Sequence, residues 1–267
     1  MKVSVYCVNY NSYDSLKNYL VSLDVAMEKT GGKVALSVFV ADNSTQYLSV
    51  DYQPKMFSLQ VVQTGGNKGY FGAVHLLMEK YSPLDFDYSI VSNVDVLLSD
   101  DFFCRLAQWG NDGQTGWIAP QIFSLLEQRD RNPQVMHRYS KRKLQILKIK
   151  FRFPLLNWVY NNTVYKSKKL VRHEPGEIYA GHGSFIILTK AYFEQCGIIV
   201  YPVFLFCEEI YLAEQCQQHQ LKVVYDPSLR VNDAEHVSTG TFSRSRYCRY
   251  NVDAISYILK MYYAPEH

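Results

Sequence analysis

Strand-like and helix-like segments alternate over about the first hundred residues, and this alternation constrains the fold more than any other feature of the sequence. The runs VSVYCVNY, KVALSVFVADNS, LQVVQ and FDYSIVSNVDVLL are rich in β-branched and aromatic residues, which is typical of buried strands. Apolar residues recur at helical spacing at Leu16, Leu20, Leu23 and Met27, and a glycine-rich turn, GGNKGYFG, opens a second helical pattern. The alternation predicts an α/β fold in which helices flank a mostly parallel central sheet, with ligands beyond the carboxyl ends of the strands.

Polar side chains follow each of the four predicted strands. They are Asn9 and Asn11, Asp42 and Asn43, Asn67 and Lys68, and Asn93 and Asp95. Each alone is an ordinary turn residue, but four such pairs in succession along one sheet edge indicate a ligand site. In SNVDV a lone carboxylate leaves a buried strand two residues after an amide. This arrangement suits a hard divalent cation, and an Asx turn is the alternative interpretation.

Two adjacent glutamates, Glu208 and Glu209, join the aromatic run FLFC to a helical pattern. A carboxylate is costly to desolvate and is rarely buried without a partner. Acidic residues at a helix N-terminus complement the helix macrodipole, which is one interpretation of the pair. The other interpretation is a catalytic carboxylate. Neighbouring helical residues point about 100° apart, so the pair cannot straddle one bond, and the spacing favours a single base.

A basic segment interrupts the α/β pattern in the middle of the chain. Between Arg129 and Arg172 there are 13 Lys or Arg residues and one acid, whereas the rest of the chain is acidic overall. Within it, residues 137–158 mix cations with Leu, Ile, Phe and Trp, as an interfacial membrane segment does. A solvated loop that caps the core is the alternative. Nucleic-acid binding is not expected, because no recognised binding motif is present.

The six cysteines are scattered and form no CxxC pair, which favours reduced thiols in a cytosolic protein over disulfides or a zinc site. The start of the chain, MKVSVYCVNYNS, lacks the apolar stretch of a signal peptide. No run approaches the roughly 18 apolar residues of a membrane span. We therefore expect a cytoplasmic protein.

Six motifs occur in the order typical of family 2 glycosyltransferases, and together they most resemble the bacterial rhamnosyltransferase-like branch. They are VSVYCVNYNS, VFVADNST, GNKGYFGAVH, SNVDV, YAGHGSFIILTKAYFEQCG and FLFCEEIYLAEQCQQHQLKVVYDPSLRV. The resemblance covers nearly the whole chain except the basic middle segment and the last helix. It implies a GT-A fold, with a nucleotide-sugar-binding half over residues 1–120. A basic, membrane-associated insertion would then span 121–175, and the acceptor and catalytic half with a C-terminal helix 176–267, all within one domain.

The resemblance also implies roles for individual residues. Asp42 matches the acid that hydrogen-bonds the pyrimidine base, and Val8, Asn9 and Asn11 form the turn that flanks this base. Asn67, Lys68 and Gly69 match the turn beside the nucleoside. Asp95 matches the metal-binding aspartate of a DxD-like motif, with Asn93 in its weaker first position, and His236 lies where many members place a histidine near the diphosphate and its metal. His182 and Gly183, in GHGSF, match the segment that lines the sugar and acceptor pocket.

In family 2 glycosyltransferases an acid pair starts the helix that corresponds to the one beginning with Glu208 and Glu209 in this sequence. The second acid of that pair is the general base, which the resemblance assigns to Glu209. The expected reaction is therefore an inverting, Mg²⁺- or Mn²⁺-dependent sugar transfer from a nucleoside-diphosphate sugar to a hydroxyl of a lipid-linked saccharide. The branch suggests dTDP-rhamnose as donor. The sequence does not decide between a thymidine and a uridine nucleotide. The expected setting is bacterial O-antigen or capsule assembly, peripherally on the cytoplasmic face of the inner membrane. The alternative is a catalytically inactive GT-A protein that binds sugar nucleotides or glycans.

Overall fold

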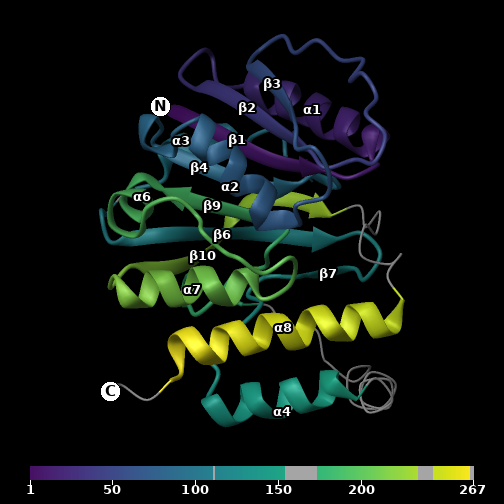
Figure 1. Cartoon of the computed structure of the whole chain (residues 1–267). Helices are drawn as coiled ribbons and strands as arrows, with labels where there is room; N and C mark the ends of the chain where they lie inside the picture. Colours follow the sequence, from purple (N-terminus) through teal and green to yellow (C-terminus); the bar gives the residue numbers. More distant parts are fainter. Residues whose placement is uncertain (111, 154–172, 234–242, 265–267) are drawn as a thin grey trace.

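The structure is a computed structural model that describes residues 1–110, 112–153, 173–233 and 243–264. The strands of these residues form one ten-stranded sheet with helices on both faces (Figure 1). Its main order is β3-β2-β1-β4-β9-β6-β10-β5, while β7 pairs with β6 and β8 with β10. The predicted α/β class is therefore confirmed.

The first half of the sheet is parallel, as the alternating sequence pattern predicts. β1 pairs with β2 and β4, and β2 pairs with β3, all in parallel. Helix α1 connects β1 to β2 and α2 lies between β3 and β4, whereas residues 43–57 join β2 to β3 without a helix. The bounds are β1 (Lys2–Asn9), α1 (Tyr13–Glu28), β2 (Ala35–Asp42), β3 (Ser58–Gln63), α2 (Tyr70–Lys80), the short 3₁₀ helix η1 (Pro83–Asp85) and β4 (Tyr88–Asn93).

The second half of the sheet is mixed, so the expectation of a mostly parallel sheet holds only for the first half. β9 lies antiparallel to both β4 and β6, whereas β10 runs parallel to β6. β9 follows the basic segment instead of a short helical crossover, so no βαβ unit constrains its direction. The bounds are β5 (Val96–Leu98), α3 (Phe102–Gln108), β6 (Thr115–Ser124), β7 (Arg129–Asp130), α4 (Lys141–Arg152), β8 (Gly176–Ile178), β9 (Phe185–Thr189), α6 (Lys190–Cys196), α7 (Glu208–Gln218), β10 (Lys222–Asp233) and α8 (Arg244–Tyr262).

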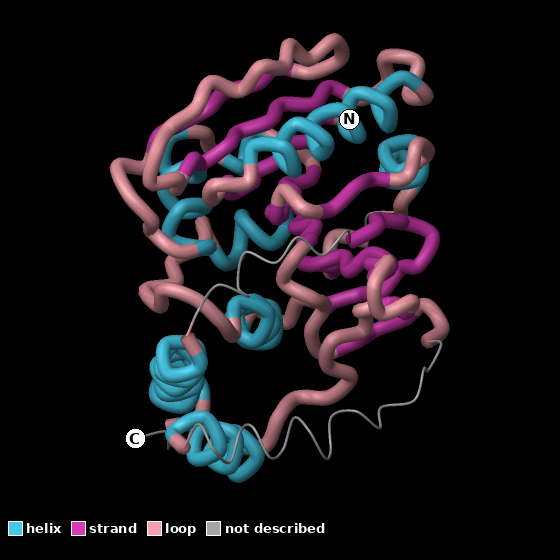
Figure 2. The backbone as a smooth tube through the Cα atoms, turned by 90° about the vertical axis from the view of Figure 1, so that its right-hand side faces the viewer, coloured by secondary structure: helices cyan, strands magenta, loops and turns pink. Residues whose placement is uncertain are grey.

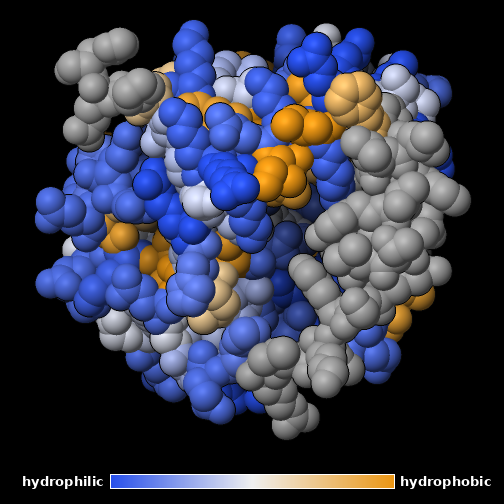
Figure 3. Space-filling view, turned by 90° about the horizontal axis from the view of Figure 1, so that it is seen from below, coloured by the Kyte–Doolittle hydropathy of each residue, from blue (hydrophilic) through white to orange (hydrophobic). Residues whose placement is uncertain are grey.

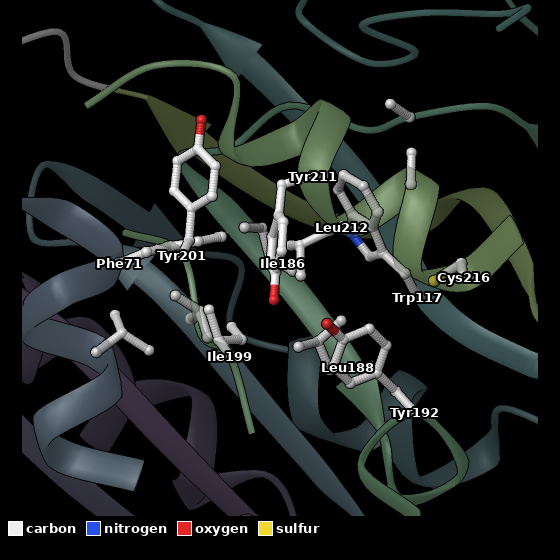
Figure 4. Close-up of a cluster of buried hydrophobic side chains, with 14 of the residues drawn as sticks. Phe71, Trp117, Ile186, Leu188, Tyr192, Ile199, Tyr201, Tyr211, Leu212 and Cys216 are labelled. Atoms are coloured by element: carbon white, nitrogen blue, oxygen red, sulfur yellow. The ribbon is translucent and has the colours of Figure 1, made fainter. Parts of the chain in front are cut away.

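Each face of the sheet carries its own buried core, because side chains alternate along the strands. In β9, Phe185 and Ile187 join the core under α1 and α3. Ile186 and Leu188 point to the opposite face, where α2, α6 and α7 supply Phe71, Tyr192 and Leu212 among others (Figure 4). This aromatic-rich core seats α7, the helix that begins with the two glutamates.

The basic segment contains a helix, α4, which lies beside α8 in an outer layer beyond α7 (Figures 1 and 2). Ser140 caps α4, since its side chain accepts a hydrogen bond from the Lys143 backbone N–H. Leu144 is its buried anchor, while Ile146 and Ile149 are exposed. Within the described parts of the chain, no helix combines the length and the apolar character needed to cross a bilayer.

Candidate active site

A cleft of about 590 Å³ opens at the carboxyl ends of β1 and β4 and reaches the start of α7. Its position is the one that parallel α/β sheets favour for ligands. Ten residues singled out in the sequence line it: Val8, Asn43, Asn67, Gly69, Asn93, Asp95, His182, Gly183, Glu208 and Glu209. These residues come from motifs far apart in the chain, so the fold brings the separate motifs together in one cleft.

Three predicted base-binding residues do not line the cleft. Asp42 and Asn9 are buried, and the Asp42 carboxylate accepts hydrogen bonds from Asn9 Nδ2 at 3.2 Å and from the Tyr13 hydroxyl at 2.6 Å. Asn11 has a left-handed backbone, with φ of 53°, and its side-chain oxygen accepts from the Thr45 N–H at 3.2 Å. In this structure these groups stabilise the turn after β1. The role of Asp42 toward a nucleotide base stays a prediction.

The glycine-rich turn packs closely against the loop that precedes α7. Gly69 has a φ of +76°, and a Cβ built there would lie 2.0 Å from the Phe204 carbonyl oxygen. The Gly69 carbonyl accepts a hydrogen bond from Asn43 Nδ2 at 2.8 Å, and its N–H donates to Asn67 Oδ1 at 2.9 Å. Only glycine fits this close approach. Lys68 does not line the cleft and instead borders a neighbouring hollow of about 340 Å³.

The turn into α7 has two consecutive non-glycine residues in left-handed conformations. Phe206 has a φ of 76° and Cys207 a φ of 59°. Such residues cost of order 1–3 kcal/mol each and persist where their surroundings hold them. The Phe206 carbonyl accepts from the Tyr201 hydroxyl at 2.7 Å, and the Phe206 N–H donates to Glu208 Oε1 at 2.9 Å. These contacts hold a strained turn that aims the start of α7 at the cleft.

Burial makes both glutamates weaker acids than usual. Desolvation, followed by the nearby charge of Glu209, raises the pKa of Glu208 to about 8. Desolvation also raises the pKa of Glu209. Glu208 is 8% exposed, whereas Glu209 is partly exposed and its Oε2 would lie 3.9 Å from a Cβ built at Gly183. Glu209 therefore faces the GHGSF segment across the cleft and is the better placed of the two to accept a proton from a ligand.

Asp95 lies between β4 and β5 and has a second carboxylate near it. In the β5–β10 ladder Val96 stands opposite Asp233, the last residue of β10, and both Asp95 and Asp233 line the cleft. Mg²⁺ and Mn²⁺ prefer hard oxygen ligands, and Mg²⁺ sites commonly use one or two carboxylates with phosphates and water. The donor set therefore fits such an ion. No group of three or more His, Cys, Asp or Glu residues that could enclose a metal occurs among the described residues, and His236 lies outside them.

Several cleft residues were not among those predicted from the sequence. Arg131 lines the cleft and places its Nη1 3.1 Å from Asp233 Oδ2. Tyr247 and Asn251 enter from α8, whose sequence pattern indicated only an apolar stripe. Asp233 ends β10 in the structure, beyond any strand predicted from the sequence. Arg131, Tyr247 and Asn251 reach the cleft through tertiary packing, for which the local sequence carries no signal.

His182 is held in the cleft wall by its neighbours. Its ring Nδ1 lies 2.9 Å from the Ser184 hydroxyl, and its backbone N–H donates to Asn132 Oδ1 at 2.6 Å. Gly181, directly before it, packs so closely that a Cβ there would lie 2.7 Å from Ala119 Cβ. The GHGSF segment is thus fixed against β6, and its outer edge faces Glu209.

No protein-family model matches the chain, and no curated protein matches it in sequence. Solved structures share its fold. The mannosyltransferase PcManGT from Pyrobaculum calidifontis, in complex with GDP-Man and Mn²⁺, has a TM-score of 0.55 at 13% identity, covering 92% of this chain and 60% of its own. TarS from S. aureus has a TM-score of 0.57 at 10% identity, and the match covers 98% of this chain and 44% of TarS. GalNAc-T7 with UDP, GalNAc and Mn²⁺ has a TM-score of 0.62 at 12% identity, and the match covers 98% of this chain and 49% of GalNAc-T7.

These matches confirm the predicted GT-A fold. The chain spans from 44% to 60% of the length of these three proteins. At identities this low the likeness concerns the fold, and the activity has to be argued from the site.

Proposed function

We propose that this protein is an inverting glycosyltransferase of the family 2 type. The observation that carries the proposal is the glutamate pair with raised pKa values at the strained start of α7, in the same cleft as Asp95. The solved proteins of the same fold support the choice of donor, since they are complexes with GDP-Man, with UDP and, for a TarS fragment, with UDP-GlcNAc. The donor is thus a nucleoside-diphosphate sugar. The sequence resemblance suggests dTDP-rhamnose.

In this proposal Glu209 is the general base. It takes the proton of the acceptor hydroxyl while that oxygen bonds to the anomeric carbon and the bond to the diphosphate breaks on the opposite face. Asp95 and Asp233 would hold a Mg²⁺ or Mn²⁺ ion, which supplies positive charge for the departing diphosphate. Glu208 is the more buried acid and accepts the Phe206 N–H, so we assign it to holding the turn.

The acceptor half, residues 176–267, and the basic insertion, residues 121–175, are assigned to a lipid-linked saccharide at a membrane, and residues 1–120 to the donor. Support comes from α4, where Ile146 and Ile149 are 57% and 54% exposed, and from Phe153 directly after it, which is 53% exposed. Ile146 and Ile149 lie on one side of the helix by their spacing, with exposed cations around them. Seen from the side of α4, apolar side chains lie among hydrophilic ones (Figure 3). Such a face suits anionic headgroups.

The biological setting follows from this acceptor. We place the protein peripherally on the cytoplasmic face of the inner membrane, in the assembly of a bacterial surface polysaccharide such as O-antigen or capsule. The competing function is a catalytically inactive protein of the same fold that binds a sugar nucleotide or glycan. The two differ in whether a bound donor is consumed.

The test is a screen of nucleotide sugars by thermal shift with Mg²⁺ or Mn²⁺, followed by measurement of nucleotide release from the stabilising donor. Wild-type protein should release nucleotide, faster with a saccharide acceptor. Glu209→Gln should bind the donor with nearly unchanged affinity and release nothing, because an amide cannot accept the proton. Glu208→Gln is the matched control. If it is the inactive variant and Glu209→Gln is active, the base is assigned to the wrong glutamate. Donor binding without release in wild-type protein would favour the inactive alternative.

A further inference from the structure

The cleft is strongly acidic for a site that is to bind a diphosphate. Four carboxyl groups line it: Asp95, Glu208, Glu209 and Asp233. Burial raises the pKa of Glu208 to about 8, so at neutral pH the negative charge of the cleft comes mainly from the other acids. Among the described residues that line it, Arg131 is the only Arg or Lys. An anionic ligand in a cleft of this charge needs compensating cations. A metal ion supplies part of that charge, and Arg131 is the cation that the described lining itself contributes.

Arg131 is attached to a rigid part of the sheet. It directly follows β7, and its backbone N–H donates to the Ile122 carbonyl of β6 at 2.8 Å. The next residue, Asn132, is buried, donates from Nδ2 to the Pro120 carbonyl at 2.7 Å and accepts from the His182 N–H at 2.6 Å. The backbone that carries the guanidinium is therefore fixed to β6 and to the GHGSF segment. A side chain mounted in this way is held close to one position.

Asp233 orients the guanidinium toward the Asp95 end of the cleft. The Arg131–Asp233 pair has an N–O distance of 3.1 Å, and the two side chains are 22% and 5% exposed. Asp233 stands opposite Val96, the residue after Asp95. Arginine presents five N–H donors in a planar fork, so it can pair with a carboxylate on one edge and a phosphate on another. The pair lies where the phosphates of a donor would meet a cation held by Asp95.

We propose that Arg131 binds a phosphate of the nucleoside diphosphate, with Asp233 as its positioning partner. This inference rests on the proposed function and assigns the phosphate-binding cation of that site. When the bond between the anomeric carbon and the diphosphate oxygen breaks, its electron pair stays on the diphosphate, which gains negative charge. Arg131 then stabilises the leaving group together with the metal ion. A competing role is purely structural, an ion pair that joins the β7 strand to the end of β10.

The experiment compares Arg131→Met with Arg129→Met by calorimetric titration. Arg129 precedes it by two residues, pairs with Glu127 and does not line the cleft. The probes are UDP, dTDP and GDP with their nucleosides, each in Mg²⁺ and in EDTA. Arg131→Met should weaken diphosphate binding about 10- to 100-fold in both buffers, the loss of one charge-assisted hydrogen-bond pair. Nucleoside binding should be unchanged, and Arg129→Met should match wild type.

A second variant separates binding from folding. Arg131→Met leaves Asp233 without this partner, so the variant can lose stability for that reason alone. The double variant Arg131→Met/Asp233→Asn removes both charges of the pair. In EDTA it should recover thermal stability and still bind diphosphate weakly.

Three results overturn the assignment. If the double variant recovers diphosphate affinity, or if Arg131→Met binds diphosphates as wild type does, the ion pair is structural and the proposed function stands. If wild-type protein binds no nucleoside diphosphate in either buffer, the proposed function fails and this assignment fails with it.

Discussion

Replacing Glu208 with Gln should stabilise the protein, and increasingly so as the pH rises. The folded protein holds this proton with a pKa of about 8, against 4.5 for an ordinary glutamate. From pH 4.5 to pH 8 the folded state therefore binds a proton that the unfolded state has lost, and stability falls as the pH rises. Gln resembles the protonated acid and can still accept the Phe206 N–H through its side-chain oxygen.

The size of the effect follows from the shift. At about 1.4 kcal/mol per pKa unit, the cost of keeping Glu208 in its site is on the order of 3 kcal/mol at pH 7. It approaches about 5 kcal/mol above pH 8 and nearly vanishes at pH 4.5. For a chain of this size about 3 kcal/mol corresponds to roughly 6–12 °C in Tm. The measured quantity is the difference in the free energy of unfolding between variant and wild type. The contributions of titrating groups that both proteins share cancel in this difference.

The assay is chemical denaturation of both proteins from pH 5 to pH 8.5. Glu194, which is exposed on α6, provides the matched control as Glu194→Gln. The Glu208→Gln difference should grow by several kcal/mol across this range, and the control difference should stay flat. A flat difference for Glu208→Gln would show that its carboxyl is hydrated in the native state and that burial does not perturb it. The acid pair would then not be desolvated in the folded protein.

Three further changes test the site and its surroundings. Gly69→Ala should destabilise the protein by about 2 kcal/mol or more beyond Gly65→Ala, because both sites have positive φ but only Gly69 meets a carbonyl at 2.0 Å. Equal losses in denaturation would refute the close packing. Asp95→Ala should abolish the dependence of nucleoside-diphosphate binding on divalent ions, and wild-type affinity that EDTA does not change would contradict the metal assignment. Binding to anionic liposomes should be salt-sensitive and should be lost when five cations of the α4 segment are replaced by Gln. These five are Lys141, Arg142, Lys143, Lys148 and Lys150. If the substituted protein still binds the liposomes, this face is not the membrane contact.

The parallel half of the fold could be predicted because its signals are local. Strand composition and helical spacing lie within single elements, and each strand end marks the sheet edge where the cleft forms. The same signal does not say which way a side chain points. Asn9 and Asp42 end neighbouring strands and bond to each other without lining the cleft, whereas Asn93 and Asp95 reach the cleft. A position at a strand end therefore predicts that a residue lies near the site. Whether its side chain reaches the cleft depends on the packing around it.

The second half of the chain could be predicted less well, because its contacts join segments far apart in the sequence. Arg131 enters the cleft through the pairing of β6 with β7 and through Asp233, about a hundred residues later. Tyr247 reaches it because α8 crosses near the loop before α7, where its ring stacks edge-on to Phe206 at 5.0 Å. The local sequence does not distinguish Arg131 from the other cations of the basic segment, or Tyr247 from the other aromatic residues near the start of α8. The antiparallel direction of β9 was not predicted for a related reason, since no short crossover sets it.

The strained start of α7 is held in place partly from the opposite side of that helix. Glu214, 1% exposed, accepts two hydrogen bonds from Arg138 at 2.8 Å each and one from the Tyr179 hydroxyl at 2.6 Å. The Tyr263 hydroxyl adds a contact at 3.0 Å from the end of α8. A buried carboxylate is stable only with such partners, so the cluster fixes the rotation of α7 about its axis. That rotation decides whether Glu209 faces Gly183 across the cleft. The polar cluster far from the cleft therefore belongs to the machinery that orients the proposed base.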